Sequence, residues 1–431
     1  MTPTVDASAD SDRAAEIRNA LTDQLRSDGM ITSAVVERAF RRVPRHLFVP
    51  EGTPLEAAYD ADDSVMVKTG KDGVVVSSIS APFIQARAIE QAGLGPDMSV
   101  LEIGSGGTNA ALLAEVVGPD GRVVSVDIDP EVIARAGAAL EATGYGSRVT
   151  VVQADAGNRV PEFDEQFDAI IVTAGAWDLA PAWLEQLSEN GTIVVPLRMN
   201  GVTRSIGFRR EIDHLVSTSA EVCGFVPMQG AGAHDERVLL LPDAHGHNVK
   251  LRFDGEVPRD ISLLDGVLAA QRTEVWSGVT IEHGVSFADL HLWFAGFLPG
   301  FCKLAVDEGT GFAAERKSWF PFGVVRGDSF AYLAIRPALE GAGIEFGARA
   351  YGAYGAAAAT AMVEQIQAWD RRARGRPAPS FAYWPTGTDR PQTSASTAVL
   401  EKTHGVVTIS WPSAADAAAG QGLLHNPERK E

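Results

Sequence analysis

The regular alternation of short apolar strands with helices between residues 98 and 197 constrains this chain more than any other feature. Five apolar runs predict strands, and segments with helical spacing lie between them. The predicted strands cover 99–103, 122–128, 149–153, 169–173 and 192–197, and the predicted helices cover 110–117, 130–143 and 181–187. Alternation of this kind is typical of a parallel sheet with helices on both faces, so we expect an α/β fold.

The alternation stops after residue 198, and the 431-residue chain is too long for one ordinary domain. Further strand-like runs follow, then an Ala-rich helix near 353–373, an aromatic stretch within 375–397 and a final strand from residue 405. A run of small residues at 230–233 suits a boundary. We expect a disordered acidic tail (1–12), an α/β domain (13–230), a C-terminal α+β domain (231–412) and a polar tail (413–431).

Net charge restricts the partners of the protein. Its 37 basic and 56 acidic side chains give a formal charge of −19, which disfavours sequence-independent binding to nucleic acid or to an anionic membrane. No apolar run is long enough for a transmembrane helix, and the N-terminus lacks the features of a secretory signal. The two cysteines, Cys223 and Cys302, lack metal-ligand spacing. We therefore expect a cytoplasmic protein without a metal, nucleic-acid or membrane partner.

A glycine turn after the first predicted strand points to a ligand. The sequence LEIGSGGTN places Glu102 at the end of a buried strand, two positions before Gly104, and a helix follows. Small residues allow a ligand to approach the backbone closely, and a helix N-terminus offers free N–H groups. A tight strand-to-helix turn without a ligand would need the same glycines, so the turn alone is weak evidence.

A carboxylate at the end of the second predicted strand narrows the choice of ligand. Asp127 follows Gly104 by 23 positions, a spacing at which an acid accepts hydrogen bonds from both hydroxyls of a ribose. A nicotinamide dinucleotide and S-adenosylmethionine both fit this feature. The pattern E-x-G-x-G, and the replacement of a third glycine by Thr108-Asn109, favour S-adenosylmethionine, whose product is S-adenosylhomocysteine.

An acid after the third strand completes the predicted cofactor site. Asp155 in the sequence QADA can meet the adenine amino group, although it could instead cap a helix. Asp168, at the entry of the fourth strand, is better explained as a turn residue. Together these elements predict the following cofactor contacts: Glu102, Gly104, Ser105, Gly106, Asn109, Asp127, Ile128, Asp155, Ala156 and Thr173.

Eight segments, in order along the chain, resemble the protein-L-isoaspartate O-methyltransferase family. They are RRVPRHLFVP (41–50), AYDADDSVMV (58–67), SISAPF (78–83), LEIGSGG (101–107), VDIDPEV (126–132), FDAIIVTAGA (167–176), GTIVVPL (191–197) and GFVPM (224–228). The motifs RVPRH-x-FVP and SISAP are specific to this family rather than to methyltransferases in general. The resemblance covers about residues 15–230. It implies a Rossmann-like class I S-adenosylmethionine-dependent methyltransferase, with the C-terminal α+β domain as an addition.

By this resemblance Ser80 is the active-site residue, with its hydroxyl beside the substrate carboxylate and the transferred methyl group. Its neighbours Ser78, Ile79, Ala81 and Pro82 are the implied substrate contacts. From the residues alone, Ser80 precedes an expected helix start, so it could also be an N-cap. We find no Ser/His/Asp triad, and methyl transfer to a carboxylate needs none, because an aspartate is already nucleophilic at neutral pH.

Two departures from the family pattern change the expected substrate. Between Met66 and Ser80 the family has a short stretch of the type PIGxGQTI, whereas this chain has the longer VKTGKDGVVVSSI, with Lys68 and Lys71. About 200 further residues follow the family-like part. This extended architecture resembles a subgroup associated with ribosomally made, modified peptides, which include lanthipeptides, graspetides and imiditides, and with the FxLD system.

The resemblance to this subgroup implies that the substrate is an ordinary aspartate in a precursor peptide that a partner enzyme has already cyclised. Its methyl ester would close to a succinimide (aspartimide), which can hydrolyse to isoaspartate. Two alternatives stay open. One is a repair methyltransferase acting on isoaspartate in damaged proteins, and the other is a cofactor-binding peptide scaffold without catalysis.

The second predicted domain offers three candidate features, each with a plainer explanation. His234, His245 and His247 lie within 14 residues, but histidines in a polar loop are more often only a loop than a metal site. The aromatic stretch 291–306 is more often core than a peptide-binding groove. Arginines at the end of the long helix suit its C-terminal dipole, or could dock an acidic leader peptide: Arg371, Arg372, Arg374 and Arg376.

Overall fold

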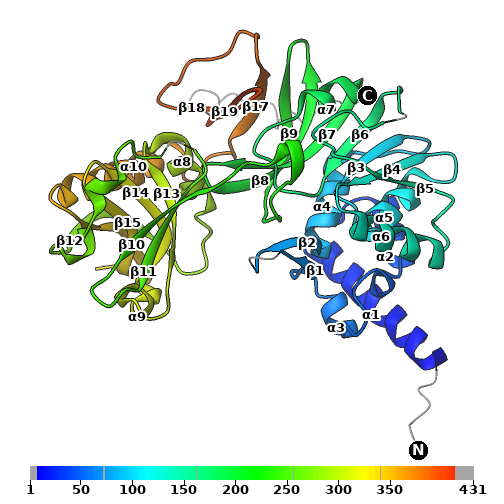
Figure 1. The fold of residues 1–431 in the computed structure, drawn as a ribbon, viewed down its shortest axis with the longest axis horizontal. Coiled ribbons are helices and arrows are strands. Elements are labelled where there is room, and N and C mark those ends of the chain that lie inside the picture. Colours follow the sequence, from blue (N-terminus) through cyan, green and yellow to red (C-terminus); the bar gives the residue numbers. More distant parts are fainter. Residues whose placement is uncertain (1–6, 71–72, 162, 256, 340, 413–431) are drawn as a thin grey trace, which may run out of the picture.

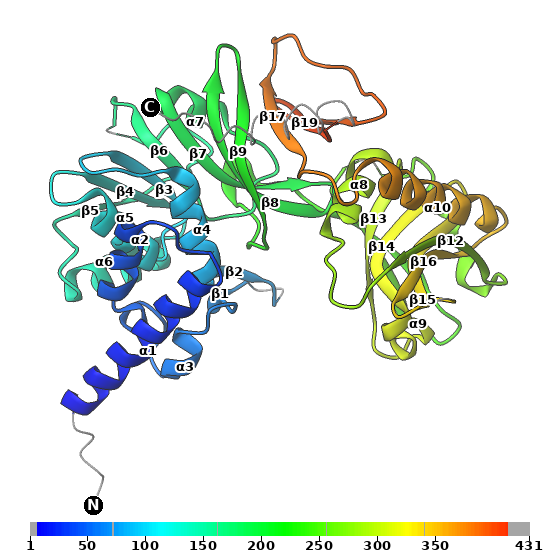
Figure 2. The ribbon, with the colours of Figure 1, turned by 180° about the vertical axis from the view of Figure 1, so that it is seen from behind.

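The computed structural model describes residues 7–70, 73–161, 163–255, 257–339 and 341–412. Within them the chain forms two units that lie side by side (Figures 1 and 2). The large-sheet unit, residues 7–222 and 380–410, is built on a ten-stranded sheet, and the small-sheet unit, residues 237–372, is built on a seven-stranded sheet. The predicted polar tail, 413–431, and residues 1–6 of the predicted disordered tail lie outside the described residues.

A parallel sheet forms the centre of the large-sheet unit, as the alternation predicts. Its strands pair in the order β5-β4-β3-β6-β7. Alternate residues of β3 face opposite apolar clusters, Val100 on one side and Leu101 and Ile103 on the other. Burial of both faces explains why these strands read as nearly continuous apolar runs. The bounds are β3 (Ser99–Ile103), β4 (Arg122–Asp127), β5 (Val149–Gln153), β6 (Phe167–Val172) and β7 (Leu187–Met199).

Helices cover both faces of this sheet (Figure 1). The side chains of α5 are almost wholly buried between the sheet and the N-terminal helices. Pro130 and Pro181 open α6 and α7 as the first helical residue, a position that suits proline because its missing N–H has no partner there. The helices are α4 (Pro82–Ala92), α5 (Thr108–Val117), α6 (Pro130–Ala142) and α7 (Pro181–Gln186).

Five antiparallel strands extend the sheet beyond β7, and three of them come from the C-terminal end of the chain. They continue in the order β8-β9-β17-β19-β18 and span β8 (Val202–Glu211), β9 (His214–Val222), β17 (Ser380–Pro385), β18 (Thr397–Glu401) and β19 (Gly405–Ser410). Our expectation of one C-terminal domain over 231–412 is therefore wrong for residues 380–410, which belong to the large sheet. The reason is packing: Phe381 and Tyr383 of β17 are buried in the core of the large sheet, and the Tyr383 hydroxyl donates to Asp178 Oδ1 at 2.8 Å.

The N-terminal helices α1 (Ala7–Ser27) and α2 (Ala34–Arg42) pack beside α5, with a single turn η1 (Arg45–Leu47) and the short α3 (Leu55–Ala58) after them. Because α1 begins at Ala7, the expected disordered tail is too long by six residues. The segment after residue 6 contains alanines, which favour helix, and acids, which suit the first helical turn.

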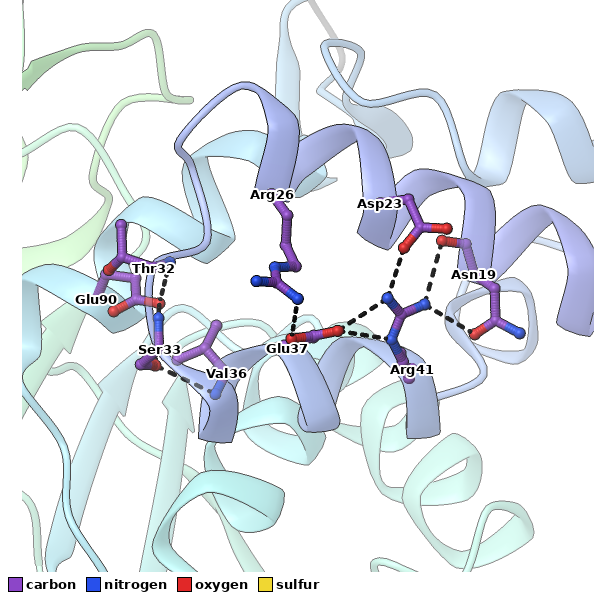
Figure 3. A network of polar contacts seen from close by, with 9 residues as sticks. All are labelled: Asn19, Asp23, Arg26, Thr32, Ser33, Val36, Glu37, Arg41 and Glu90. Atoms are coloured by element: carbon purple, nitrogen blue, oxygen red, sulfur yellow. Dashed lines mark hydrogen bonds and ion pairs between the residues drawn. The ribbon is translucent and has the colours of Figure 1, made fainter.

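Figure 3 shows the polar network that joins these helices to α4. The Arg41 guanidinium donates to Glu37 of its own helix and to Asp23 of α1, at 2.9 and 2.5 Å. Glu90 Oε1 on α4 accepts from the backbone N–H groups of Thr32 and Ser33, both at 2.8 Å. Glu90 therefore anchors the start of α2, in addition to the Ser33 N-cap.

The small-sheet unit is an antiparallel sheet in the order β10-β11-β13-β14-β15-β16-β12. Helices α8 (Ala288–Phe297) and α10 (Gly355–Arg372) cover one face. The other face carries α9 (Gly311–Ala314) and short 3-10 turns at η3 (Ile261–Leu264), η4 (Val267–Ala269) and η5 (Arg316–Ser318). The strands are β10 (Arg237–Pro242), β11 (Asn248–Phe253), β12 (Thr273–Ile281), β13 (Phe301–Val306), β14 (Trp319–Arg326), β15 (Ser329–Pro337) and β16 (Ile344–Tyr351).

For two sequence features of this unit, the structure supports the simpler of the two explanations given above. Trp293 and Phe294 in the aromatic stretch are 1% and 0% exposed, so this stretch is core. Two of the four arginines at the end of α10 donate to backbone carbonyls of neighbouring segments, Arg372 to Ala395 at 3.0 Å and Arg374 to Thr280 at 2.8 Å. They fasten the helix end rather than present a free basic patch.

Polar contacts fix the two units against each other. The Asp254 carboxylate, only 4% exposed, forms an ion pair with Arg198 of β7 and accepts from the backbone N–H of Gly201 at 2.7 Å. Asn200 Nδ2 and Arg204 Nη2 donate to carbonyls of Ala295 and Ala288, in and at the start of α8. In addition to these polar contacts, the two units share one continuous apolar core.

Candidate active site

A cavity of about 680 Å³, including the space at its mouth, lies at the carboxyl ends of the parallel strands. In open α/β sheets ligands bind at this edge. Of the ten residues predicted to contact the cofactor, eight line the cavity: Gly104, Ser105, Gly106, Asp127, Ile128, Asp155, Ala156 and Thr173. Glu102 and Asn109 do not line it.

The glycine turn shapes the floor of the cavity. Gly104 has φ +99°, a conformation that favours glycine, and a Cβ there would collide with Thr173 Oγ1. The Thr173 hydroxyl in turn donates to the carbonyl of Gly104 at 2.9 Å. Glycine at this position therefore lets the turn pack directly against Thr173 at the floor of the cavity.

The Asp127 carboxylate is held in one orientation at the end of β4. Its Oδ2 accepts from the backbone N–H of Ser105 and its Oδ1 from that of Asp129, both at 2.9 Å. Burial raises the pKa of Asp127 above its usual value. Each oxygen keeps a further lone pair, so the group can accept hydrogen bonds from two ribose hydroxyls without moving.

Asp155 lines the cavity and also holds a later part of the chain. Its Oδ1 accepts from the backbone N–H of Gly157 at 3.0 Å, and its Oδ2 accepts from that of Ala231 at 2.7 Å. No helix follows it, so the alternative of a helix cap does not apply. Asp155 therefore places the turn η2 (Gly230–Gly232) beside the cavity.

Glu102 and Asn109 do not line the cavity, so their contact with the cofactor stays a prediction. Glu102 is fully buried on the face of β3 that α5 covers, and it accepts from Ser125 Oγ, which lies 2.9 Å from Ser105 Oγ. Burial raises the pKa of Glu102 to about 7. The alternation of side chains along a strand turns Glu102 away from the cavity. It supports the glycine turn through Ser125 and Ser105.

The segment with Ser80 follows β2 (Val75–Ile79), which pairs with β1 (Val65–Thr69) in a hairpin. Of the predicted substrate contacts only Ser78 lines the cavity, whereas Ile79, Ala81 and Pro82 are buried and do not line it. Ser80 is half-buried and lies just outside the lining.

Two observations bear on the role of Ser80. The N-cap of α4 is Ala81, so Ser80 is not the cap. Its hydroxyl makes no hydrogen bond with any residue in the described ranges, which leaves it free for a substrate. The Ser80 carbonyl accepts from Arg45 Nη2 at 2.8 Å, and Arg45, whose pKa burial lowers to about 10, also donates to Ala58 O and Gln85. The RVPRH motif therefore anchors the SISAP motif.

Sequence reasoning missed one wall of the cavity. Val226, Pro227, Met228 and Gln229 line it, although the motif GFVPM was recognised as family-like. Main-chain hydrogen bonds join this wall to the end of β6, from Gly175 N to Val226 O at 2.8 Å and from Met228 N to Gly175 O at 3.1 Å. The GFVPM motif could have predicted this wall if it had been considered together with the strand ends that border the cavity.

Lys68, in the segment that departs from the family pattern, ties the hairpin to the cofactor side. Its Nζ lies 2.6 Å from Asp129 Oδ2 and 2.7 Å from Glu131 Oε2. Hydrogen bonds with these acids raise the pKa of Lys68. Asp129 caps α6 and lines the cavity, so the hairpin and the cofactor site are coupled.

The residues present fit S-adenosylmethionine. Glycine at 104 lets the turn pass close to Thr173 at the cavity floor, and Asp127 offers fixed acceptors suited to ribose hydroxyls. No cluster of three His, Cys, Asp or Glu side chains suited to a metal ion occurs in the described part of the chain. Of the three histidines considered above, His234 stacks on Trp177 at 3.9 Å. No helix within the described ranges is long and apolar enough to cross a membrane.

Comparisons with known proteins agree with this site. The family described as protein-L-isoaspartate(D-aspartate) O-methyltransferase matches residues 16–233. A protein-L-isoaspartate O-methyltransferase of Hyperthermus butylicus is 39% identical over 190 residues, 42% of this chain and 75% of that protein. One from Korarchaeum cryptofilum is 33% identical over 220 residues, 49% of this chain and 96% of that protein.

A structure of a Plasmodium falciparum relative of the same description, in complex with S-adenosyl-L-homocysteine, has a TM-score of 0.43 at 17% identity and covers 49% of this chain and 98% of that chain. The match of the family over half of the sequence, and the relatives covered over most of their length, settle the assignment. The chain belongs to the protein-L-isoaspartate O-methyltransferase family and is an S-adenosylmethionine-dependent carboxyl O-methyltransferase.

Proposed function

We propose that this protein methylates the side-chain carboxylate of an aspartate in a ribosomally made precursor peptide and directs that aspartate to a succinimide. The observation that carries the proposal is the small-sheet unit. Nearly the whole Korarchaeum relative aligns with about half of this chain, so the small-sheet unit is an addition to a complete family-like enzyme. A large addition beside the active site suits an enzyme that must hold one particular peptide.

The attachment of the small-sheet unit supports this role. Residues 230–236 connect the cavity wall at Met228 and Gln229 to β10, and His234 on this connection stacks on Trp177 next to the end of β6. Lys402 Nζ lies 3.3 Å from the other side of the Trp177 ring and donates to Arg198 O at 2.7 Å. A peptide held on the small-sheet unit would therefore lie in a fixed relation to the cavity.

The chemistry needs positioning more than proton transfer. The bound cofactor supplies an electrophilic methyl group on a sulfonium. Asp127 and the backbone at Gly104–Gly106 would hold the nucleoside end, and Ser78, with Ser80 two positions further along the chain, would receive the substrate carboxylate. No general base is required, because an aspartate with a pKa of about 3.9 is already ionised at neutral pH. Correct alignment alone can lower a barrier by about 7–11 kcal/mol in favourable cases.

The methyl ester then decides the outcome on the peptide. One carboxylate oxygen forms the bond to the methyl carbon as the carbon–sulfur bond breaks. The backbone nitrogen of the following residue next attacks the ester carbonyl, methanol leaves with the amide proton, and the five-membered succinimide closes. Water can open this ring to aspartate or isoaspartate.

The second candidate is repair of isoaspartate in damaged proteins. The names of the relatives favour it, because both are called protein-L-isoaspartate O-methyltransferases. The hairpin with Lys68 and the small-sheet unit are the features that favour the precursor peptide instead.

A deletion tests the proposal. Replacing residues 237–372 by a short Gly/Ser linker keeps β17–β19 in the sheet, whereas truncation after residue 230 removes them and serves as the control for sheet integrity. Because the deletion uncovers part of the shared apolar core, cofactor binding and thermal unfolding first establish that the variant is folded. The folded variant should methylate an aspartate-containing precursor peptide more than about tenfold less efficiently than the full chain, a loss of more than about 1.4 kcal/mol. Equal efficiency on the precursor would remove the small-sheet unit from the reaction.

A further inference from the structure

A second cavity lies within the small-sheet unit, far along the chain from the cofactor site. It encloses about 550 Å³, including the space at its mouth, under α9 and η4 on the face of the sheet opposite α8 and α10. Its walls combine polar groups with apolar and aromatic side chains, the latter being Leu268 from η4, Phe312 from α9, Tyr332 from β15 and Tyr351 from β16. A space of this size and character suits one amino-acid side chain.

The Tyr332 hydroxyl marks the cavity as a binding site. Tyr332 is 2% exposed, and its hydroxyl makes no hydrogen bond with any residue that the structure describes. Buried polar groups are normally paired, and the neighbouring Trp319 follows that rule, because its indole N–H donates to Phe312 O at 2.9 Å. Burial raises the pKa of Tyr332, so the hydroxyl keeps its proton. It is a hydrogen-bond donor aimed into an open space.

Charges at the rim limit what can enter. Arg272 Nη1 donates to both oxygens of Glu315, at 3.0 and 2.9 Å, and Arg349 donates to Glu315 and to Glu274, both at 2.8 Å. Arg272 also lies 3.4 Å from Glu274. These four groups neutralise one another, and the Asp243 carboxylate also lines the cavity, so its lining has no unpaired cation for an anion. It suits a neutral side chain with a flat apolar body.

An open sheet edge leads from this cavity toward the cofactor unit. Strand β10 is an edge strand that pairs only with β11. Asp243, directly after β10, lines the cavity, and Arg237, at the start of β10, lines a cleft with His234 on the connection to the cofactor cavity. The outward side chains Val238 and Leu240 are 46% and 57% exposed.

Such an edge is unusual in a protein that stands alone. Exposed apolar edge strands pair readily with another extended chain, and peptides bind to many domains by adding a strand in this way. A six-residue strand spans about 20 Å. One extended peptide could therefore reach from the cavity to the connection with the active site.

We propose that the small-sheet unit binds the peptide substrate as an added strand along β10. One aromatic side chain of the peptide, carrying a hydrogen-bond acceptor for the Tyr332 hydroxyl, packs in the cavity against Phe312, Tyr332 and Tyr351. Aromatic side chains stack favourably on aromatic walls and commonly anchor interfaces. Arg237, which has no ion-pair partner among the described residues, faces the acidic side chains of an aspartate-containing peptide near the active site. This inference rests on the proposed function, which supplies the peptide.

The test uses the full chain and a phage-displayed library of random 12-residue peptides. Peptides selected on the wild-type protein are synthesised with a fluorescent label, and their affinity is measured by anisotropy. Tyr332→Phe removes only the hydroxyl and should weaken binding about threefold to tenfold, the range of one hydrogen bond. Leu240→Asp should weaken it at least about tenfold. The matched controls at exposed positions, Tyr354→Phe and Leu339→Asp, should leave the affinity unchanged.

Other results would overturn the proposal. Selected peptides that bind all five proteins equally would place recognition elsewhere. A wild-type dimer in sedimentation that Leu240→Asp converts to a monomer, with no change in peptide affinity, would show that a second copy covers β10. This test measures binding alone, so the proposed function and this site fail separately. Aspartyl peptides that bind at this site but are not methylated would contradict the proposed function. An aspartyl peptide that is methylated equally well by the wild type, Tyr332→Phe and Leu240→Asp would contradict this site.

Discussion

Lys68 on the β1–β2 hairpin and Asp129 at the N-terminus of α6 form an ion pair, with 2.6 Å between Nζ and Oδ2. The contact joins the segment that departs from the family pattern to a residue of the cofactor cavity. The hairpin also accepts a hydrogen bond at Val76 O from Gln229 Nε2, at 3.3 Å. The cavity is thus bordered by three parts of the chain that are distant in sequence.

Lys68→Met should loosen the hairpin without unfolding the protein, because Lys68 is partly exposed. We expect cofactor affinity to fall about twofold to fivefold, the range of exposed ion pairs. Salt screens such pairs, so the difference from wild type should vanish at 1 M salt. Calorimetric titration at low and high salt checks this, and a difference that persists at high salt would contradict an electrostatic role.

Asp127→Ala should weaken cofactor binding by well over tenfold. Two ribose hydroxyls lose a charged acceptor, and hydrogen bonds to charged groups are worth about 1.5–3 kcal/mol. Asp168→Ala is the matched control, because Asp168 is an exposed acid on β6 of the same sheet that accepts, among the described residues, only from Ser99 N. An unchanged dissociation constant for a folded Asp127→Ala protein would refute the ribose assignment.

Ser80→Ala and Ser78→Ala should affect different parameters. Ser78 lines the cofactor cavity, so its loss should weaken cofactor binding. Ser80 lies outside the lining with a free hydroxyl, so its loss should lower kcat about fivefold to tenfold, equivalent to one hydrogen bond, at unchanged cofactor affinity. Steady-state kinetics with calorimetry separates the two, and a purely structural Ser80 would leave kcat intact.

Glu90→Gln should destabilise the protein in a pH-dependent way. Burial opposes ionisation, but hydrogen bonds from Ser33 and Thr32 outweigh it and lower the pKa of Glu90. Because the pKa of Glu90 is lower in the folded than in the unfolded state, the carboxylate stabilises the fold at pH values above its unfolded pKa of about 4.3. This contribution is lost as the pH falls through the pKa of the folded state.

Urea unfolding should therefore show Glu90→Gln to be less stable by about 1–2 kcal/mol at pH 7, as for the loss of a helix cap. The difference in free energy of unfolding between Glu90→Gln and the wild type should become smaller below about pH 4. Glu141→Gln, at an exposed site on α6, is the control and should show no gap at either pH. A gap that is constant with pH would exclude the carboxylate as its source.

Local patterns predicted the parallel sheet because each strand and helix carries its own signal. Asp127 and Thr173 were predictable for the same reason, since parallel strands end at one edge. The position of Tyr383 was not predictable, because the pairing of β17 with β9 joins residues more than 160 positions apart and depends on a shared core.

Glu102 shows a different limit of sequence reasoning. Its motif predicts a cofactor contact, whereas strand alternation buries the side chain against Ser125. Met228 and Gln229 were missed because the GFVPM motif does not show which strand end it contacts; the main-chain bonds of Gly175 bring this segment to the cavity.

The central claim is that the enzyme converts an aspartate, and not isoaspartate, to a succinimide. Its most direct test is the mass of the precursor peptide, modified by any partner cyclase, after incubation with the full chain and S-adenosylmethionine. Methylation adds about 14 Da, and loss of methanol then leaves the peptide about 18 Da below its starting mass, by the formulae of a methyl ester and its cyclised product. We predict this loss at one aspartate, trapped by hydrazine, with a generic isoaspartyl peptide a poor substrate. Efficient methylation of unrelated isoaspartyl peptides, with the aspartyl precursor unchanged, would contradict the account and identify a repair enzyme.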